Sequence, residues 1–402
     1  MLALGISAAG CGAVPAGQGA SAPPARPARP AHPARPAHPA HPATATRHAP
    51  AVTPSCPAQV LSRMTEAQRV GQLFLVGLGA DQAGPATVAA IRASHFGSVL
   101  FGTTSYAGLA ATRGVTSAVQ SLAPATAGAR FFIAANQEGG QVQQLEGPGF
   151  PAMPAALDQG QLPPGALEQQ AAAWGGVLRQ AGVNLNLAPV MDVVPPGTDQ
   201  QNAPIGMLER EFGHDPATVA VHGVAFLHGM ARAGVATTAK HFPGLGRVRG
   251  NTDFSPGVVD TATTQGDAYL QPYQAAINAG VPFVMVSLAS YTRFDAQHLA
   301  VFSSRVMQTM LRQQMHFGGV IVSDDMGAAA AVGGVSPAAR ALGFLAAGGD
   351  VITSASTPVA VQMDRAVLAQ ASADAAFRGR VNAAAARVLA AKQAYGLLPC
   401  SG

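Results

Sequence analysis

Four clusters of polar and charged residues in this sequence each follow a short apolar run. They contain Asn136, Asp192, the Lys240-His241 pair and the Asp324-Asp325 pair. Two adjacent carboxylates after an apolar, β-branched run repel each other and cost desolvation free energy, so we expect a ligand or a reaction to use Asp324. A carboxylate can act as a nucleophile, while ammonium and imidazole groups can bind hydroxyl and carbonyl oxygens. The clusters therefore indicate a site for a polyhydroxylated or charged ligand, although Asp192 could instead bond only the amides of its own loop.

The apolar runs before these clusters predict the elements that position them. The runs end in Gly, Pro or polar residues, and helical periodicity lies between them, as in residues 166–181, 216–233 and 303–315. Strands buried on both faces read as continuous apolar runs, so we expect an α/β fold, a single-domain (β/α)8 barrel of the TIM type. A doubly wound open sheet is the alternative, disfavoured because no Gly-x-Gly-x-x-Gly turn follows the first strand. The eight expected strands are residues 73–77, 98–101, 131–135, 183–188, 235–239, 283–287, 320–323 and 351–354.

The composition excludes several classes of protein. Of the 402 residues, 48% are hydrophobic and only 11% are charged, and the net charge is +4. Arginines in the N-terminal segment account for this surplus, so we expect no basic face and no nucleic-acid partner. The sequence lacks metal-ligand spacings such as His-Glu-x-x-His or Cys-x-x-Cys, so we expect no cofactor and no metal.

The N-terminal segment predicts export. Residues 1–11 end in Ala-Ala-Gly-Cys, which resembles a bacterial lipobox in which Cys11 is lipidated. The positive region and the longer apolar stretch of a signal peptide are missing, so we expect the true start codon upstream. Residues 12–55 are rich in Pro, Ala, Arg and His, which favours an extended tether over a metal site at its histidines. We therefore expect a lipoprotein on the extracytoplasmic face that contacts the membrane only through its anchor.

Two further cysteines, Cys56 and Cys400, flank the expected barrel domain at residues 56–402. The ends of a barrel lie close together because the last helix packs beside the first strand, and an exported protein meets oxidising conditions. We therefore expect these two cysteines to form a disulfide; two free thiols are the alternative.

Five stretches of the sequence, in order between residues 60 and 397, resemble glycoside hydrolase family 3, especially its single-domain β-N-acetylglucosaminidases. Residues 240–244 (Lys-His-Phe-Pro-Gly) resemble a family signature, and residues 137–140, 188–192, 209–216 and 319–326 resemble other family stretches. The resemblance implies a retaining mechanism with Asp324 as the nucleophile. The residues that it implies for binding the sugar are Asn136, Gln144, Asp192, Arg210, Lys240 and His241.

Three departures from the family pattern concern this pocket. Asn136 stands where the family usually has Asp, and Gln144 stands where it has Arg, so the pocket loses charge. The family's acid/base His is absent from the loop at residues 246–253, and Leu245 replaces another family His. Asp253 lies nearest the missing acid/base, so we expect it to serve as proton donor; the alternative is that it only caps a turn after Asn251.

The function that the resemblance implies is a retaining β-N-acetylhexosaminidase that acts on N-acetylglucosamine-containing cell-wall glycans, as in peptidoglycan turnover. The alternative is a non-catalytic glycan-binding lipoprotein with a degenerate site, which the changes at Asn136, Gln144 and the loop favour. Another glycosidase specificity and phosphorolysis also remain open. Asp324 favours hydrolysis, because a binding protein needs no nucleophile.

Overall fold

A computed structural model describes residues 55–78 and 82–400 of the chain. Eight parallel strands form a closed barrel in the order β1-β13-β12-β9-β7-β6-β3-β2. Each of the eight expected runs overlaps one of these strands, so the predicted (β/α)8 barrel is confirmed. The strands are β1 (Phe74–Leu78), β2 (Ser98–Phe101), β3 (Phe132–Ala135), β6 (Leu185–Asn186), β7 (Ala236–Phe242), β9 (Phe283–Val286), β12 (Val320–Asp325) and β13 (Val351–Ser354).

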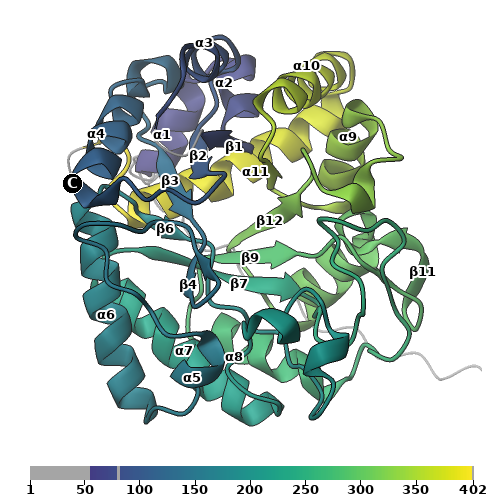
Figure 1. The fold of residues 1–402 in the computed structure, drawn as a ribbon. Helices are drawn as coiled ribbons and strands as arrows, with labels where there is room; N and C mark the ends of the chain where they lie inside the picture. The colour runs from purple at the N-terminus through teal and green to yellow at the C-terminus, as the bar shows by residue number, and fades with distance from the viewer. Residues whose placement is uncertain (1–54, 79–81, 401–402) are drawn as a thin grey trace, which may run out of the picture. The chain divides into compact units, whose positions relative to one another are not determined.

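Helices surround the barrel strands, as Figure 1 shows. Thr65 and Gln68 form a capping box at the start of α2, in which each side chain bonds the backbone of the other. The expected helix at residues 303–315 is η6 (Arg305–Gln314), a π-helix. The α-helices are α1 (Cys56–Arg63), α2 (Glu66–Gly71), α3 (Pro85–Ser94), α4 (Gly108–Gln120), α5 (Ala156–Gln159), α6 (Pro164–Gln180), α7 (Pro216–Arg232), α8 (Gln271–Asn278), α9 (Pro337–Ala347), α10 (Thr357–Ala373) and α11 (Ala375–Ala394).

Short elements fill the connections between the barrel strands and the helices. The 3-10 helices are η1 (Ala123–Thr126), η2 (Asp199–Gln201), η3 (Gly206–Leu208), η4 (Ala268–Leu270), η5 (Ala300–Phe302) and η7 (Ala330–Val332). The short strands are β4 (Gln137–Gly139), β5 (Val142–Gln143), β8 (Val259–Asp260), β10 (Ser290–Tyr291) and β11 (Asp295–Leu299). The β4–β5 hairpin and η2–η3 are important below because they carry charged residues near the carboxyl ends of the barrel strands.

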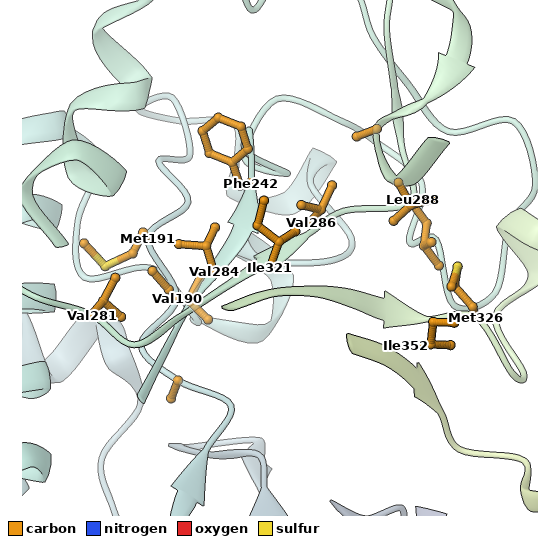
Figure 2. Close-up of a cluster of buried hydrophobic side chains, with 14 of the residues drawn as sticks. Val190, Met191, Phe242, Val281, Val284, Val286, Leu288, Ile321, Met326 and Ile352 are labelled. Atoms are coloured by element: carbon orange, nitrogen blue, oxygen red, sulfur yellow. The ribbon is translucent and has the colours of Figure 1, made fainter. Parts of the chain in front are cut away.

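Alternate side chains of the strands pack on the two faces of the barrel wall. On β9, Phe283 and Met285 belong to the cluster inside the barrel, whereas Val284 and Val286 belong to the layer between strands and helices. Figure 2 shows part of that outer layer, where Val284 and Val286 lie near Ile321 of β12. Because both faces are packed, the strands cannot rotate or slip without exposing apolar side chains. The polar residues at the strand ends are therefore held in fixed positions.

The two ends of the barrel domain are joined. Cys56, at the start of α1, and Cys400 form a disulfide with their Cα atoms 6.0 Å apart, which is the pairing expected from the sequence. The expected signal segment, the linker and Cys11 lie outside the described residues. Within the described residues, no helix combines the length and the apolar character that crossing a membrane requires.

Candidate active site

A cavity of about 350 Å³ opens at the carboxyl ends of the barrel strands, the end at which barrel enzymes place their chemistry. The residues that line it come from strands far apart in the sequence, including β7 and β12. Of the residues expected at the site, those that line the cavity are Asn136, Gln144, Arg210, Lys240, His241, Asp253 and Asp324. Asp192 is the one expected site residue of the barrel that does not line it.

A larger cavity, of about 550 Å³, lies among residues that precede β3 and β6 and among the last residues described, such as Leu397. Arg113, Arg130 and Arg179 are among its lining residues, and no carboxylate or imidazole lies among those described there. Without an acid, a base or a carboxylate nucleophile, this larger cavity does not suit acid/base chemistry. The smaller cavity is therefore the candidate active site.

Glu138 organises the cations beneath the cavity. Arg210 donates two hydrogen bonds of 2.8 Å to the carboxylate of Glu138, and Lys240 Nζ lies 2.6 Å from its Oε1. Burial alone would raise the pKa of Glu138, but the charges of Arg210 and Lys240 lower that pKa to about 2. Glu138 is thus ionised at all ordinary pH values and holds both cations in place. The sequence analysis did not select Glu138, whose role depends on partners that lie far away in the sequence.

The β4–β5 hairpin fixes the position of Glu138. Gln159 donates a 2.8 Å hydrogen bond to the Glu138 carbonyl from α5. Gly139 adopts a φ of 111°, and a Cβ atom there would collide with the Pro154 carbonyl. Glycine is required at this turn because other residues rarely adopt that conformation. The backbone therefore aims the Glu138 side chain at the cations rather than at the solvent.

His241 is oriented by Asp192, which lies fully buried behind it. Asp192 Oδ2 accepts a 2.8 Å hydrogen bond from His241 Nδ1, and Oδ1 accepts bonds of 2.7 Å from the Tyr273 hydroxyl and 2.8 Å from the Leu245 amide. Burial alone would raise the pKa of Asp192, but His241 and these donors lower it. Because Nδ1 carries the proton toward Asp192, Nε2 is the nitrogen left for a ligand. Asp192 therefore acts through His241, and Tyr273 is a further supporting residue that the sequence analysis missed.

Asp324 and Asp325, the last residues of β12, have different surroundings. Asp325 Oδ1 accepts hydrogen bonds from the Gly327 and Ala355 amides, at 2.8 and 2.9 Å, so this carboxylate is engaged by the backbone. Asp324 accepts a 2.9 Å bond from the Asp325 amide and lines the cavity near the positive charges of Arg210 and Lys240. Both carboxylates line the cavity, but that of Asp325 is held by the two amides, which leaves Asp324 as the candidate nucleophile.

Asp253 lies at the mouth of the cavity on the β7–β8 loop, residues 243–258. Its carbonyl accepts a 3.0 Å hydrogen bond from the Ala330 amide, which ties this loop to the loop that follows β12. Partial desolvation and the nearby negative charge of Asp324 raise the pKa of the Asp253 carboxyl to about 6. Its amide also donates a 2.9 Å hydrogen bond to Asn251 Oδ1, so the turn expected in the alternative interpretation is present too. Asp253 thus combines a turn position with the raised pKa that a proton donor needs.

The two neutral substitutions, Asn136 and Gln144, contact each other, and Asn136 also contacts Lys240. Gln144 Oε1 accepts a 2.8 Å hydrogen bond from the Asn136 amide, and Asn136 Oδ1 accepts a 2.7 Å bond from Lys240 Nζ. The pocket therefore keeps a connected polar wall although both side chains are uncharged. Lys240 is shared between one carboxylate and one amide, so it remains buried and bonded.

Several known proteins that resemble this chain are named as glycosidases. Residues 65–391 match the profile of the glycosyl hydrolase family 3 N terminal domain. A solved β-N-acetylhexosaminidase from Beutenbergia cavernae is 48% identical, with a TM-score of 0.81, and the match covers 82% of this chain and 99% of that one. A family 3 β-N-acetylglucosaminidase from Paenibacillus is 25% identical, with a TM-score of 0.74, and the match covers 84% and 64% of the two chains.

A curated β-hexosaminidase from Stenotrophomonas maltophilia (strain R551-3) is 36% identical over 229 residues, which are 55% of this chain. The chain spans 66% of that relative's length, just under two thirds. The family profile, by contrast, runs from before β1 to beyond β13 and includes every cluster that lines the cavity. The chain belongs to glycosyl hydrolase family 3.

Proposed function

We propose that this chain is a retaining β-N-acetylhexosaminidase that removes N-acetylglucosamine from cell-wall glycans. The names of its relatives support the activity. The observation that carries the proposal is the pair of carboxylates at one cavity, Asp324 and Asp253, in different surroundings. Asp324 lies near cations, while the pKa of Asp253 is raised to about 6. A carboxylate nucleophile and a second carboxyl group that can hold a proton are what double-displacement glycosidases require.

The chemistry divides into two steps. In the first, an Asp324 oxygen forms a bond to the anomeric carbon, the glycosidic C–O bond breaks, and Asp253 gives its proton to the departing oxygen. In the second, Asp253 takes a proton from water, the water oxygen bonds the anomeric carbon, and Asp324 leaves as carboxylate. Each group returns to its starting state, and the anomeric configuration is retained.

The buried cations hold the sugar during both steps. Arg210 and Lys240 offer N–H donors to hydroxyl and N-acetyl oxygens, and His241 offers Nε2. Glu138 and Asp192 fix these three side chains before a ligand arrives. Binding therefore loses little conformational entropy in ordering them. Asn136 and Gln144 supply amide groups in place of charges, so we expect weaker binding of the sugar than a fully charged pocket would give.

The location at the cell wall is part of the proposal. It is supported by the lipobox-like end of residues 1–11 and by the Pro-rich linker, which together suit a lipid-anchored, exported protein. The Cys56–Cys400 disulfide of the barrel agrees with an oxidising compartment. A tether of this kind would hold the barrel near peptidoglycan, whose glycan chains contain N-acetylglucosamine.

Trapping of the covalent intermediate tests the proposal. The protein would be incubated with p-nitrophenyl N-acetyl-β-D-glucosaminide, with and without phosphate, and with a 5-fluoro glycosyl fluoride of the same sugar that slows the second step. We expect release of free N-acetylglucosamine and a mass increase of one fluorosugar on the peptide that contains Asp324. A product phosphorylated at the anomeric carbon would indicate phosphorolysis instead. Sugar binding without either product would favour the non-catalytic alternative.

A further inference from the structure

A second group of ionisable side chains lies outside the cavity, where the sequence analysis expected no metal. Asp199, Glu211 and His214 each bring one potential ligand atom to the same place, with these atoms all within 4.8 Å of one another. Asp199 begins η2, and the other two residues lie between η3 and α7. None of the three lines the active-site cavity, and the proposed hydrolysis uses none of them.

Glu211 carries the argument for a ligand. Its side chain is fully buried, at 0% exposure, and among the described residues no N–H group donates a hydrogen bond to its carboxylate from another side chain. Burial and the neighbouring Asp199 carboxylate raise the pKa of Glu211 to about 7. Asp199 Oδ1 and His214 Nδ1 are buried atoms without a hydrogen-bond partner there as well. Buried polar atoms are normally bonded, and a buried carboxylate is normally paired with a cation. Among the described residues, the Asp199 and Glu211 carboxylates therefore lie together with His214 Nδ1 as their nearest potential cation, and none of these atoms completes a hydrogen bond.

The spacing of these atoms suits a single metal ion. His214 Nδ1 lies 3.4 Å from Asp199 Oδ1 and 4.0 Å from Glu211 Oε1. Ligands bound tetrahedrally at about 2.1 Å from zinc lie about 3.4 Å from one another, so small side-chain shifts suffice. One imidazole with two carboxylates is a donor set for zinc or manganese, whereas calcium takes six to eight oxygens. Asp199 and His214 are 28% and 35% exposed, so an ion and its waters can enter from solvent.

We propose that Asp199, Glu211 and His214 bind one divalent transition-metal ion, with water completing its coordination. The ion fastens η2 to the segment that carries Arg210, the residue next to Glu211. Arg210 also donates a 2.7 Å hydrogen bond to the Pro204 carbonyl, so this cation of the active site is bonded within the segment between η2 and α7. The metal has a structural role and takes no part in bond cleavage.

Metal binding by paired variants tests this proposal. The full chain, stripped with chelator, would be titrated with Zn²⁺ and with Mn²⁺ by calorimetry, and its Tm measured with and without each metal. Histidines of the N-terminal linker can also bind zinc, so the informative quantity is the difference between the wild type and Glu211→Gln. We expect the wild type to bind one equivalent more than the variant, and its Tm to rise by about 3 °C or more on metal addition.

Two further variants make the test specific. His214→Gln changes a partly exposed side chain, so it tests the same site if Glu211→Gln does not fold; it should also lose the additional equivalent and the Tm rise. Glu209→Gln removes an exposed carboxylate two residues from Glu211 and should behave as the wild type. Equal stoichiometry and equal Tm shifts in all four proteins, or no saturable binding up to about 1 mM metal, would overturn the proposal. In that case Glu211 is protonated and simply shares its proton with Asp199. Because no readout uses catalysis, the result stands whether or not the chain is a hexosaminidase.

Discussion

The floor of the active-site cavity and the β7–β8 loop above it hold their charges in different ways. On the floor, Glu138 and Lys240 are 4% and 1% exposed, and each has an opposite charge within hydrogen-bond distance. On the loop, Asp253 has no cation among its hydrogen-bond partners, and its neighbour Phe254 is 81% exposed. The pKa of Glu138 is lowered to about 2, while that of Asp253 is raised to about 6.

This contrast separates binding from proton transfer. A group that must stay charged is best buried with its counter-ion, because the pair fixes both its ionisation and its position. A group that must exchange a proton with the substrate needs a pKa near the working pH, which a rim position beside one like charge supplies. Mutations on the floor should therefore change the stability of the protein and its affinity for the sugar. Mutations on the loop should change the catalytic rate and the dependence of that rate on pH.

Asp324 lies between the two regions, and its substitution should have the largest effect. Asp324→Asn keeps the size of the side chain but removes the nucleophile, so we expect kcat to fall by about 10³-fold or more with the fold unchanged. Steady-state assays with p-nitrophenyl N-acetyl-β-D-glucosaminide, together with circular dichroism, measure both. Activity within about tenfold of the wild type would remove Asp324 from the nucleophile role.

Glu138→Gln should destabilise the floor of the cavity. It leaves Arg210 and Lys240 buried without their counter-ion, so we expect the free energy of unfolding to fall by about 3–5 kcal/mol. The matched control is Glu168→Gln, which removes an exposed ion pair with Arg232 and should cost less than about 1 kcal/mol. Denaturant unfolding measures both variants, and equal losses would mean that the buried network is no stronger than a surface pair.

The stability difference between the wild type and Glu138→Gln should depend on pH. The pKa of Glu138 falls from 4.5 to about 2 on folding, so its carboxylate contributes stability that is present above the unfolded value. That contribution is lost as the pH falls from about 4.5 toward 2. The difference in unfolding free energy between wild type and Glu138→Gln should therefore be constant near neutral pH and shrink below about pH 4. A difference that persists unchanged at low pH would indicate packing rather than charge.

The comparison also explains what the sequence could predict. The barrel follows from runs of apolar residues, because burial on both faces leaves a local signal. The expected strand at residues 235–239 was too short, since β7 continues through Phe242 and contains Lys240 and His241. Lys240 and His241 are polar, so the sequence analysis placed them in a loop after the strand. In the structure they belong to the strand, and Glu138 and Asp192 hold them there. The pairing of His241 with Asp192 joins residues 49 positions apart, and that of Arg210 with Glu138 joins residues 72 positions apart, which no local pattern reveals.

The site residues divide in the same manner. Asn136, Lys240, His241 and Asp324 could be selected because they follow apolar runs. The other expected residues that line the cavity, Gln144, Arg210 and Asp253, were selected only from the family resemblance. Glu138, Tyr273 and Glu211 could not be selected, because their roles depend on what the fold brings beside them. Asp192 was selected for the sugar, but all its hydrogen bonds go to protein groups such as His241 and Tyr273. An acidic residue inside an otherwise apolar or Gly-rich stretch is the signal that could have indicated Glu138.

Asp253→Asn should affect substrates unequally. A natural disaccharide has a poor leaving group and needs the proton, so its rate should fall by about 10²-fold or more. The first step on the p-nitrophenyl glycoside should slow only mildly, since that leaving group departs with little protonation. Added azide should partly restore turnover of this activated substrate, because azide attacks the intermediate without help from a general base. Equal slowing of both substrates without an azide effect would leave Asp253 with only its turn beside Asn251.

The pH profile gives a smaller and independent effect. The first step needs Asp253 protonated, and its pKa is raised from 3.8 to about 6, so the range in which the acid form exists extends upward. We expect kcat/KM on the disaccharide to decline above about pH 6, approaching tenfold per pH unit. This alkaline limb should be absent in Asp253→Asn. An unchanged limb in the variant would assign the proton donor to another group.

Substitution of Phe254 should have the smallest effect on catalysis, and it tests the loop separately from the floor. This aromatic ring lines the cavity beside Asp253 yet is 81% exposed, so the fold gains little from burying it. A ring face at the cavity mouth can pack against the second sugar, whereas a p-nitrophenyl group is flat and small. Aromatic contacts are worth about 0.5–1.5 kcal/mol beyond burial. Phe254→Ala should therefore raise KM for a disaccharide by about three- to tenfold while leaving kcat and stability nearly unchanged.

Val221→Ala, which shortens an exposed side chain of α7 that does not line the cavity, is the control and should change neither constant. A lower kcat with unchanged KM in Phe254→Ala would show instead that the ring holds the loop, and with it Asp253, in position.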